Sequence, residues 1–495
     1  MDSLNCLLVR NLRGNWSIRL LYEYQSRHID KTKFSYIDLS NMEYFPPGKS
    51  SPLLVSSRIR EKIISRIFFS NPLPAVLEKE IIKNAQIATK SKFKIRYLIL
   101  ILELLKIRNS RDLVNYQFYG IPFGRFLHTP LIAKFGIKHF ELNRFKQIKQ
   151  VKLVYRFVFG FYRINQLLAD NNYNKIVLIN GRDVIGASAQ LSAYINKVNV
   201  VCLEESLIKS ETPKYSQWNG NMHHWKIRKN ALDRAVQKYT SNYHISDSQN
   251  YFKNNFGLIS KFWRQSLPSD PAIDIQETEY VCFFTSSEKE TTTFPTGDAL
   301  ANEFDSSDQV ECLKMVYEIT NNLGIKLIIR MHPNFGGSKL ARNEFKYFQN
   351  LTKNWANFLL IPNFDYTNSY KLAEKAKFNF IFRSTLGLEF SYRGIPVYHL
   401  APTFWSGHAI SKLISTKQEI KEVLEGHKSY NSQTDVYPDY YVFALYSNFQ
   451  GQKFENVSFI KNNKILNSKH KHKYMTVLNG IELDKPHFKF FTWRG

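Results

Sequence analysis

The sequence predicts an α/β protein built from two doubly wound, Rossmann-like domains, and three observations support this. The chain has 495 residues, whereas a single hydrophobic core stops growing at about 250–300 residues. Short apolar runs of strand length alternate with segments of helical periodicity, which is typical of parallel βαβ units. The apolar runs lead into polar residues, and open parallel sheets bind ligands at the carboxyl ends of their strands. We therefore expect an N-terminal domain over 1–265, a second domain over 275–425, and a basic extension over 426–495 that packs back on the first domain.

The N-terminal half begins with a βαβ pattern and then becomes mainly helical. Residues 4–40 alternate strand, helix and strand, and residues 52–170 have mostly helical periodicity. Further strands are predicted at 175–179, 198–203 and 242–245. The two pieces together indicate a parallel sheet with a helical insertion.

The second half restarts the same alternation after an irregular segment at about 262–279, which contains proline and aspartate and predicts the domain linker. Helices are predicted over 309–323 and 369–376. The predicted strands of this half are 280–284, 325–330, 358–361, 378–382 and 396–400.

The charge balance favours an anionic partner. Lys and Arg number 68 against 42 Asp and Glu, giving a net charge of +26, which suits nucleic acid, anionic lipid, an acidic glycan or a phosphorylated donor. No nucleic-acid-binding motif accompanies the charge, so a nucleic-acid partner is not expected. The four cysteines form no C-x-x-C pair, which indicates a reduced cytosolic protein with neither a disulfide scaffold nor a zinc site.

The N-terminus lacks the long apolar stretch of a signal peptide. The longest apolar run, 97–102, is far shorter than the roughly 20 residues of a membrane span. Lys and Arg flank it on both sides, so it fits either a buried helix with solvated ends or a basic helix resting on anionic lipid. The expected location is the cytoplasm, with peripheral attachment to the inner face of the inner membrane as the further option.

The strongest motif follows the predicted strand 378–382. It comprises Arg383, Ser384, Thr385, Gly387 and Glu389. A strand that leads into a helix N-terminus presents backbone N–H groups to phosphate, the hydroxyls add donors, and glycine lets a ligand approach the backbone. The carboxylate one turn on could accept hydrogen bonds from ribose. The alternative is an ordinary Ser/Thr N-cap with a capping-box-like Glu.

Two further strand ends in this half carry candidate donor-binding residues. Arg330 and His332 end one strand, where Pro333 fixes the turn and lets the histidine project. Ser286 and Ser287 end another and could hold phosphate oxygens. The alternatives are a structural or surface histidine and a hydrophilic loop with a cap.

The candidate catalytic groups of the N-terminal half are carboxylates and histidines, because a sugar hydroxyl needs a base within hydrogen-bond reach to act as a nucleophile. They are Asp183, Glu204, Glu205, His223 and His224. Asn180 and Arg182, beside them in the sequence, are the candidate acceptor-binding residues. The alternative is a set of polar loop residues that share no site.

Taken in order, these pieces resemble a family of bacterial capsule and surface-polysaccharide glycosyltransferases of the GT-B type, whose best-known members use CMP-Kdo. The resemblance covers residues 175 to about 400. Its matching pieces are Asn180-Gly181-Arg182, the strand end at Glu204, His223-His224, Ser286-Ser287-Glu288, His332-Pro333, and Ser384-Thr385-x-Gly387-x-Glu389 with Gly394-x-Pro396-Val397.

The resemblance implies a GT-B fold with two Rossmann-like domains facing across a cleft. It implies that the C-terminal domain binds a nucleotide-sugar donor, with His332 and the Ser384-Thr385 helix start near the phosphate and Glu389 near the ribose. The N-terminal domain would bind a glycan or lipid-linked glycan acceptor and supply the catalytic acid or base. Ser206 stands where the family often has glycine, so Glu204 and Glu205 both remain candidates and Glu204 is favoured.

No cofactor other than the donor is expected, and no metal, because no Asp-x-Asp pair ends a strand. Two rival functions stay open. One is a polymerase that transfers glycerol phosphate from a CDP-linked donor, and the other is a non-catalytic glycan- or nucleic-acid-binding protein.

Overall fold

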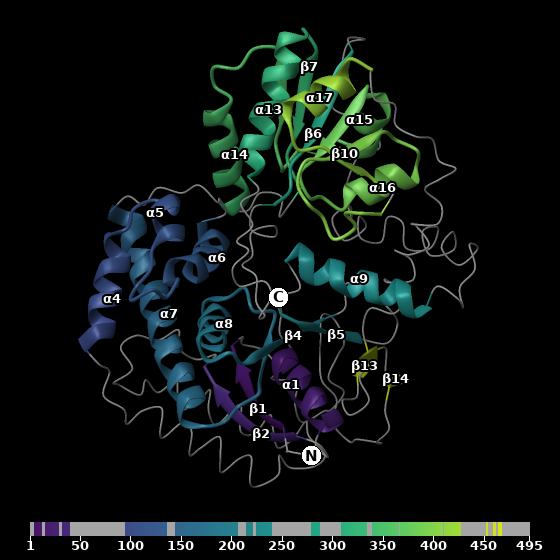
Figure 1. Cartoon of the computed structure of the whole chain (residues 1–495). Helices are drawn as coiled ribbons and strands as arrows, with labels where there is room; N and C mark the ends of the chain where they lie inside the picture. The colour runs from purple at the N-terminus through teal and green to yellow at the C-terminus, as the bar shows by residue number, and fades with distance from the viewer. Residues whose placement is uncertain are drawn as a thin grey trace.

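The computed structural model of the chain describes residues 4–11, 15–28, 32–39, 95–135, 144–205, 214–220, 224–239, 279–287, 308–333, 339–365, 367–408, 410–426, 452–453, 459–461 and 464–467. Two separate six-stranded sheets organise these residues, one for each half of the chain (Figure 1). The predicted pair of doubly wound α/β domains is therefore confirmed.

The first sheet has the order β12-β5-β4-β3-β1-β2. Its strands are β1 (Leu4–Arg10), β2 (Thr32–Asp38), β3 (Lys175–Ile179), β4 (Asn199–Glu205), β5 (Lys214–Asn219) and β12 (Gln452–Lys453). Four strands, β2, β1, β3 and β4, run parallel, and the strand order reverses between β1 and β3. At one side of the sheet β5 pairs antiparallel with β4, and β12 pairs antiparallel with β5, so a short piece of the C-terminal extension forms this edge of the sheet.

Helices cover both faces of the first sheet because its strands alternate between two cores. One face packs Leu8 and Val177 against Tyr24 of α1 (Asn15–His28). The other packs Leu7 and Ile176 against a layer of longer helices. This layer consists of α4 (Ile95–Lys106), α5 (Ser110–Asn115), α6 (Phe123–Phe135), α7 (Arg144–Asp170) and α8 (Val184–Asn196).

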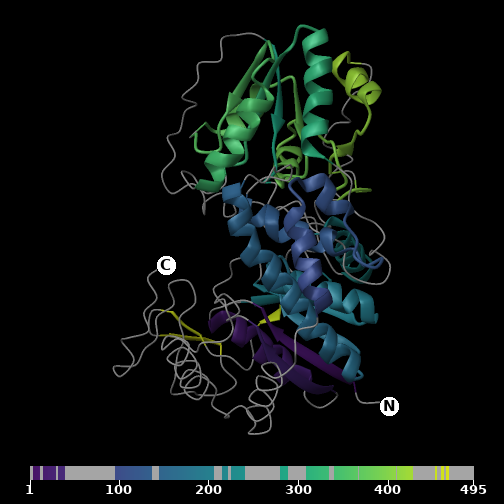
Figure 2. The same cartoon turned by 90° about the vertical axis from the view of Figure 1, so that its left-hand side faces the viewer.

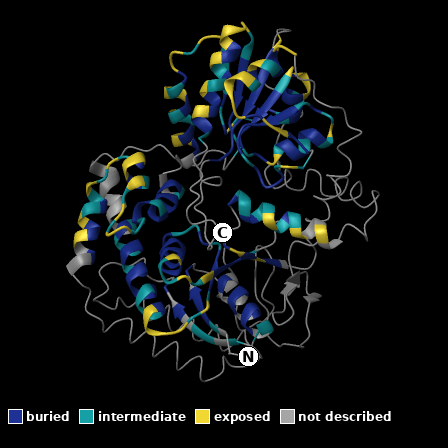
Figure 3. Ribbon diagram, in the orientation of Figure 1, coloured by how far each residue is buried: buried dark blue, intermediate teal, exposed yellow. Residues whose placement is uncertain are grey.

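The second sheet is parallel throughout and has the order β11-β10-β9-β6-β7-β8. Its strands are β6 (Tyr280–Phe284), β7 (Lys326–Arg330), β8 (Phe358–Ile361), β9 (Phe378–Ile381), β10 (Val397–His399) and β11 (Lys412–Leu413). Numbered from β6, this is the 3-2-1-4-5-6 order of dinucleotide-binding folds, with its switch point between β6 and β9. All of β6 is buried, as expected of a central parallel strand (Figure 3).

Helices also cover both faces of the second sheet. Phe283 of β6 contacts a core shared with α13 (Gln309–Asn322), α14 (Lys339–Leu351) and α17 (Lys417–Leu424). Phe284 contacts the opposite core, with α15 (Ser369–Lys375) and α16 (Leu386–Tyr392). That second core continues into the first domain, so buried side chains connect the two halves.

The remaining elements lie outside these layers. Helix α9 (Trp225–Tyr239) follows β5 and lies between the first domain and the second sheet (Figures 1 and 2). The strands β13 (Phe459–Lys461) and β14 (Lys464–Asn467) form a separate antiparallel pair. Across the part of the chain that the structure describes, no helix is both long and apolar enough to span a bilayer.

Most strands predicted from the sequence match the observed ones within one or two residues. The antiparallel strand β5 was not predicted, because its sequence KYSQWN carries no apolar run. The predicted strand 242–245 lies outside the described residues, as does all but the last residue of the predicted linker 262–279. The domain boundaries and the cleft between the domains stay predictions.

Candidate functional site

The loops that follow β6, β7 and β9 are joined to one another by hydrogen bonds. The His332 backbone N–H donates to Thr285 Oγ1 at 2.9 Å, and the Arg383 backbone N–H donates to Ser286 Oγ at 3.0 Å. Ser286 in turn donates its own N–H to Gln309 Oε1 of α13 at 2.6 Å. The structure thus brings the three sequence-predicted strand ends of this domain together at the carboxyl edge of the sheet, at its switch point.

These loop residues differ in how far they reach the surface. Ser286, Ser287 and Ser384 are buried. The side chains of His332 and Arg383 are half-buried, and Thr385 is exposed. The Ser384 hydroxyl accepts the Leu386 N–H at 3.3 Å. The buried serines therefore build the loops, and the outer surface of this edge is formed by His332, Arg383 and Thr385.

Arg330 has contacts that assign it a structural role. Its guanidinium donates to the carbonyl oxygens of Pro362 at 2.5 Å and Asp365 at 3.0 Å, with a longer bond to Thr367 at 3.4 Å. The side chain is buried, and burial lowers the pKa of Arg330 to about 10. The arginine predicted to bind donor phosphate instead anchors the loop after β8.

The helix predicted after Thr385 is α16, which has only seven residues. Thr385 makes no side-chain cap bond, whereas the Ser384 hydroxyl accepts the Leu386 N–H at the start of the helix, as the alternative of a serine cap expects. The Glu389 carboxylate accepts a hydrogen bond from the Tyr370 hydroxyl of α15. The guanidinium of Arg393 lies 4.2 Å from the Tyr370 ring centroid. Glu389 is thus held at the start of α16 by a side chain from the preceding helix.

Gly387 is closely packed within the domain. A Cβ at this position would lie 2.3 Å from Ile381 Cδ1 and 3.4 Å from Trp405 Cζ2. The close approach that the glycine permits is therefore to the sheet and to the loop after β10, where the sequence suggested an approach to a ligand.

In the first domain, Asn11 bridges the switch point between β1 and β3. Its side chain donates to Ile179 O and accepts the Ile179 N–H, and it also donates to Asp183 Oδ2. Asp183 is the N-cap of α8, accepting from the N–H groups of Ile185 and Gly186. Burial raises the pKa of Asp183, and these hydrogen bonds partly oppose the shift. The carboxylate predicted as a catalytic group is committed to capping a helix.

Asn180 and Arg182 lie in the tight turn between β3 and α8. Asn180 has a φ of 59°, and its Oδ1 accepts both the backbone N–H and the Nε of Arg182 at 3.1 Å. Both side chains are half-buried at the carboxyl edge of the first sheet. This placement is compatible with the acceptor-binding role predicted for them.

Glu204 and Glu205 lie inside β4 and pair with β5, opposite Ser216 and Tyr215. Glu204 and Asp183 both raise the pKa of the Cys202 thiol, adding to the larger effect of its burial. Glu204 and Asp183 therefore both lie near Cys202, and the preference for Glu204 as the catalytic group stays a prediction.

His224 is buried just before α9, with its ring centroid 6.2 Å from that of Trp225. His223 and Glu288 lie outside the described residues, and so does the side chain of Glu205.

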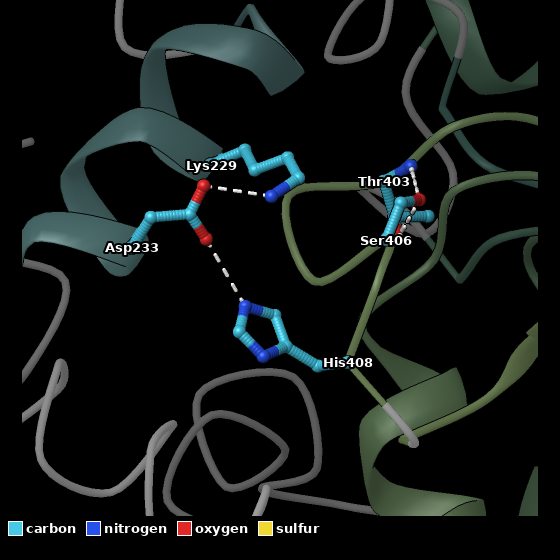
Figure 4. Close-up of polar contacts among 5 residues, drawn as sticks. All are labelled: Lys229, Asp233, Thr403, Ser406 and His408. Atoms are coloured by element: carbon cyan, nitrogen blue, oxygen red, sulfur yellow. Dashed lines mark hydrogen bonds and ion pairs between the residues drawn. The ribbon is translucent and has the colours of Figure 1, made fainter. Parts of the chain in front are cut away.

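The sequence missed a contact between α9 and the loop that follows β10. Asp233 accepts a bond from Lys229 at 2.7 Å and lies 3.1 Å from His408 Nε2 (Figure 4). The Arg228 guanidinium lies 3.8 Å from the Phe404 ring centroid. The rule of polar residues after strands did not find this contact, because Leu400 and Ala401 directly follow β10.

A buried histidine shapes that loop. His399 Nδ1 lies 2.8 Å from Ser411 Oγ, and its Nε2 lies 3.3 Å from Ser406 Oγ. Trp405 Nε1 donates to the same Ser411 hydroxyl at 2.9 Å. Burial lowers the pKa of His399 to about 4, so the ring is neutral at ordinary pH. The network connects His399 to Trp405, Ser406 and Ser411, which lie on either side of His408 in the sequence.

Among the described residues, no group of three or more His, Cys, Asp and Glu side chains could hold a metal ion. The hydrogen-bonding groups at this edge of the second domain are an imidazole, a guanidinium and a hydroxyl. They suit an anion better than a cation. Chemically, the arrangement offers an anion-binding edge in one domain and carboxylates in the other.

The mixed sheet of the first domain, the parallel sheet of the second and the order of their strands give the protein the two-domain, doubly wound α/β architecture of the GT-B class. No protein-family model and no curated protein matches the sequence.

Solved structures show a weak likeness. KpsC of Thermosulfurimonas dismutans, a β-Kdo 2,4-transferase, is 12% identical with a TM-score of 0.32, covering 55% of this chain and 79% of its own. The β-Kdo 2,7-transferase of the same organism is 14% identical with a TM-score of 0.31, covering 58% and 86%. The UDP-GlcNAc 2-epimerase of Methanocaldococcus jannaschii is 11% identical with a TM-score of 0.28, covering 88% and 96%. Such low values carry no conclusion about activity.

Proposed function

We propose that the protein is a glycosyltransferase that moves a sugar from a nucleotide-activated donor, such as CMP-Kdo, to a growing capsular or surface polysaccharide. The observation that carries the proposal is the edge of the second sheet, where the loops after β6, β7 and β9 are hydrogen-bonded at the switch point. Open α/β sheets bind nucleotides at this position. The family-like motifs of the second domain, at Ser286, His332 and Ser384, lie on these same loops.

In this proposal the second domain binds the donor. The partly exposed His332 and Arg383 and the exposed Thr385 contact the phosphate, and their positive and hydrogen-bonding groups stabilise the leaving nucleotide. Glu389 accepts hydrogen bonds from the ribose. Arg330 does not contact the donor in this proposal; it holds the loop after β8 in place.

The first domain binds the acceptor and activates its hydroxyl. Glu204 is the proposed base, because Asp183 is occupied by the N-terminus of α8. Asn180 and Arg182, at the same sheet edge, bind the acceptor glycan. A base must lie within hydrogen-bond reach of the hydroxyl it deprotonates, directly or through one water.

A donor screen tests the activity. The purified protein is incubated with CMP-Kdo, UDP-sugars or CDP-glycerol and a capsular oligosaccharide, and the products are identified by mass spectrometry. Sugar transfer that Arg383→Ala abolishes, and that Lys353→Ala at an exposed position after α14 leaves intact, supports the proposal. Transfer of glycerol phosphate from CDP-glycerol alone would establish the polymerase instead.

Two further outcomes decide the remaining alternatives. No product from any donor, together with glycan or nucleic-acid binding that collapses in salt, would identify a non-catalytic binding protein. Turnover is expected to persist in excess chelator, because we propose that the reaction needs no metal. Activity lost in chelator and restored by Mg²⁺ or Mn²⁺ would refute that part.

A further inference from the structure

Three of the large apolar side chains that the described structure leaves exposed lie close together in the sequence, at the outer side of the first domain. Ile99 and Leu102 of α4 are 46% and 54% exposed, and Tyr119, in the turn after α5, is 85% exposed. Buried Tyr97, Leu100, Ile101 and Leu104 form the opposite side of α4. One side of the helix therefore packs into the core, and the other side exposes apolar side chains to solvent.

Basic side chains lie at the end of the exposed side of α4 and just beyond it. Residues 99, 102 and 106 share one face because seven residues make two helical turns. Lys106 is exposed at the end of the helix, and Arg108 and Arg111 are exposed just beyond it. Two acidic side chains lie beside these three basic ones: Glu103 accepts the Tyr116 hydroxyl, and Asp112 accepts from Asn109. We call Ile99, Leu102, Lys106, Arg108, Arg111 and Tyr119 the α4 surface.

Tyr119 is held outward by an unfavourable turn. Phe118 and Ile121 exchange two backbone hydrogen bonds around Tyr119 and Gly120, whose φ angles are 50° and 76°. A two-residue turn with two positive φ angles favours Asn-Gly, so a tyrosine at the first position is strained. The bond from Tyr116 to Glu103 keeps this turn against α4. Strain of this kind persists where a side chain serves a function.

We infer that the α4 surface docks the protein on an anionic lipid bilayer. Apolar groups flanked by Lys and Arg insert at the boundary between headgroups and acyl chains, while the cations meet the negative headgroups. Tyrosine suits this boundary because one end of its ring is apolar and the other polar. The positive charge of this surface favours a lipid bilayer over a second copy of the chain as the partner, because two copies meeting here would bring like charges together. The inference stands whether or not the protein is a transferase.

Vesicle sedimentation tests the docking. The full-length protein is mixed with vesicles of equal parts phosphatidylglycerol and phosphatidylcholine, or of phosphatidylcholine alone. We expect binding to the anionic vesicles only, falling with salt. Each basic side chain near such a surface is worth about fivefold in partitioning. The combined Lys106→Glu and Arg108→Glu variant should therefore bind at least about 20-fold more weakly.

Matched variants separate docking from folding. Leu102→Glu should weaken vesicle binding, whereas Leu413→Glu, at an exposed apolar position of the second domain, should not. Lys412→Glu with Lys353→Glu reverses two exposed charges far from α4 and is the control for net charge. Tyr119→Asn relieves the strained turn, so it should keep or raise the melting temperature while it weakens vesicle binding.

Three results would overturn the inference. They are equal binding to neutral and anionic vesicles, equal binding by the α4 and control variants, and a loss of self-association in Leu102→Glu without any vesicle binding by the parent. The last would identify the surface as an interface between copies of the chain. Donor binding measured by calorimetry should not change in any α4 variant, so failure of this inference is distinguishable from failure of the proposed function.

Discussion

His408 Nε2 lies 3.1 Å from Asp233 Oδ1, so a residue of the loop after β10 in the second sheet contacts a residue of α9, which follows the first sheet. Asp233 also holds Lys229 at 2.7 Å. The side chains of His408 and Asp233 are 17% and 34% exposed, so the pair is only partly screened by water. The two domains therefore meet through a polar contact beside the packed Arg228 and Phe404.

We expect the pair to couple the domains weakly. Asp233→Asn and His408→Gln should each lower the free energy of unfolding by about 0.5 kcal/mol, because partly exposed ion pairs contribute little. A double-mutant cycle in urea measures the coupling. The exposed pair of Lys417 and Glu318, which lies within one domain, is the control and should couple less. A coupling of zero for Asp233 and His408 would show that the contact does not join the domains.

His332 and Arg330 should separate binding from stability. His332→Ala is expected to weaken nucleotide binding in calorimetry with little change in unfolding, because its imidazole is half-buried at the outer edge. Arg330→Met should instead cost about 3 kcal/mol of stability, because it leaves buried carbonyls without a donor. Unchanged nucleotide affinity in His332→Ala would remove His332 from the site.

Stability should fall as the pH drops from 6.5 toward 4. The pKa of His399 is lowered from 6.5 to about 4 by burial, so between these values the unfolded chain binds a proton that the folded protein excludes. Folding is then penalised by about 3 kcal/mol once the pH reaches the lower value. Urea titrations at several pH values measure this. His399→Gln should flatten the dependence, and Ser411→Ala, which keeps the imidazole, should retain it.

Gly387→Ala should destabilise the second domain by about 1–3 kcal/mol through overpacking. The added methyl would lie 2.3 Å from Ile381 Cδ1. Adding Ile381→Val removes that atom and should restore most of the loss. If the single variant unfolds like the parent but loses nucleotide binding, the glycine serves the ligand and the packing argument is wrong.

The strands of the second domain could be predicted from the sequence because fully buried parallel strands are continuous apolar runs. The segment 280–284 was predicted as a strand and is β6. Strand β5 was not, because its buried Tyr215 and Trp218 are three residues apart and belong to different cores, so the sequence shows no alternation of apolar and polar residues.

Local sequence also placed His332, Arg383 and Thr385 at one edge, because strand ends in a parallel sheet coincide. It could not assign the roles of Arg330 or Asp183. Their partners are Pro362 and Asn11, which lie 32 and 172 residues away in the chain. A polar side chain after a strand looks the same in the sequence whether it faces a ligand or a distant carbonyl.

Strand β12 has a consequence for how the protein is made. It pairs with β5 at the edge of the first sheet, yet it is translated after the whole of the second domain. A nascent chain that has finished β1 to β5 still carries an open strand edge, and open edges invite pairing with other chains. The ribosome must therefore complete the second domain before β12 can pair with β5. The first sheet is then finished after the second, although most of it is translated earlier.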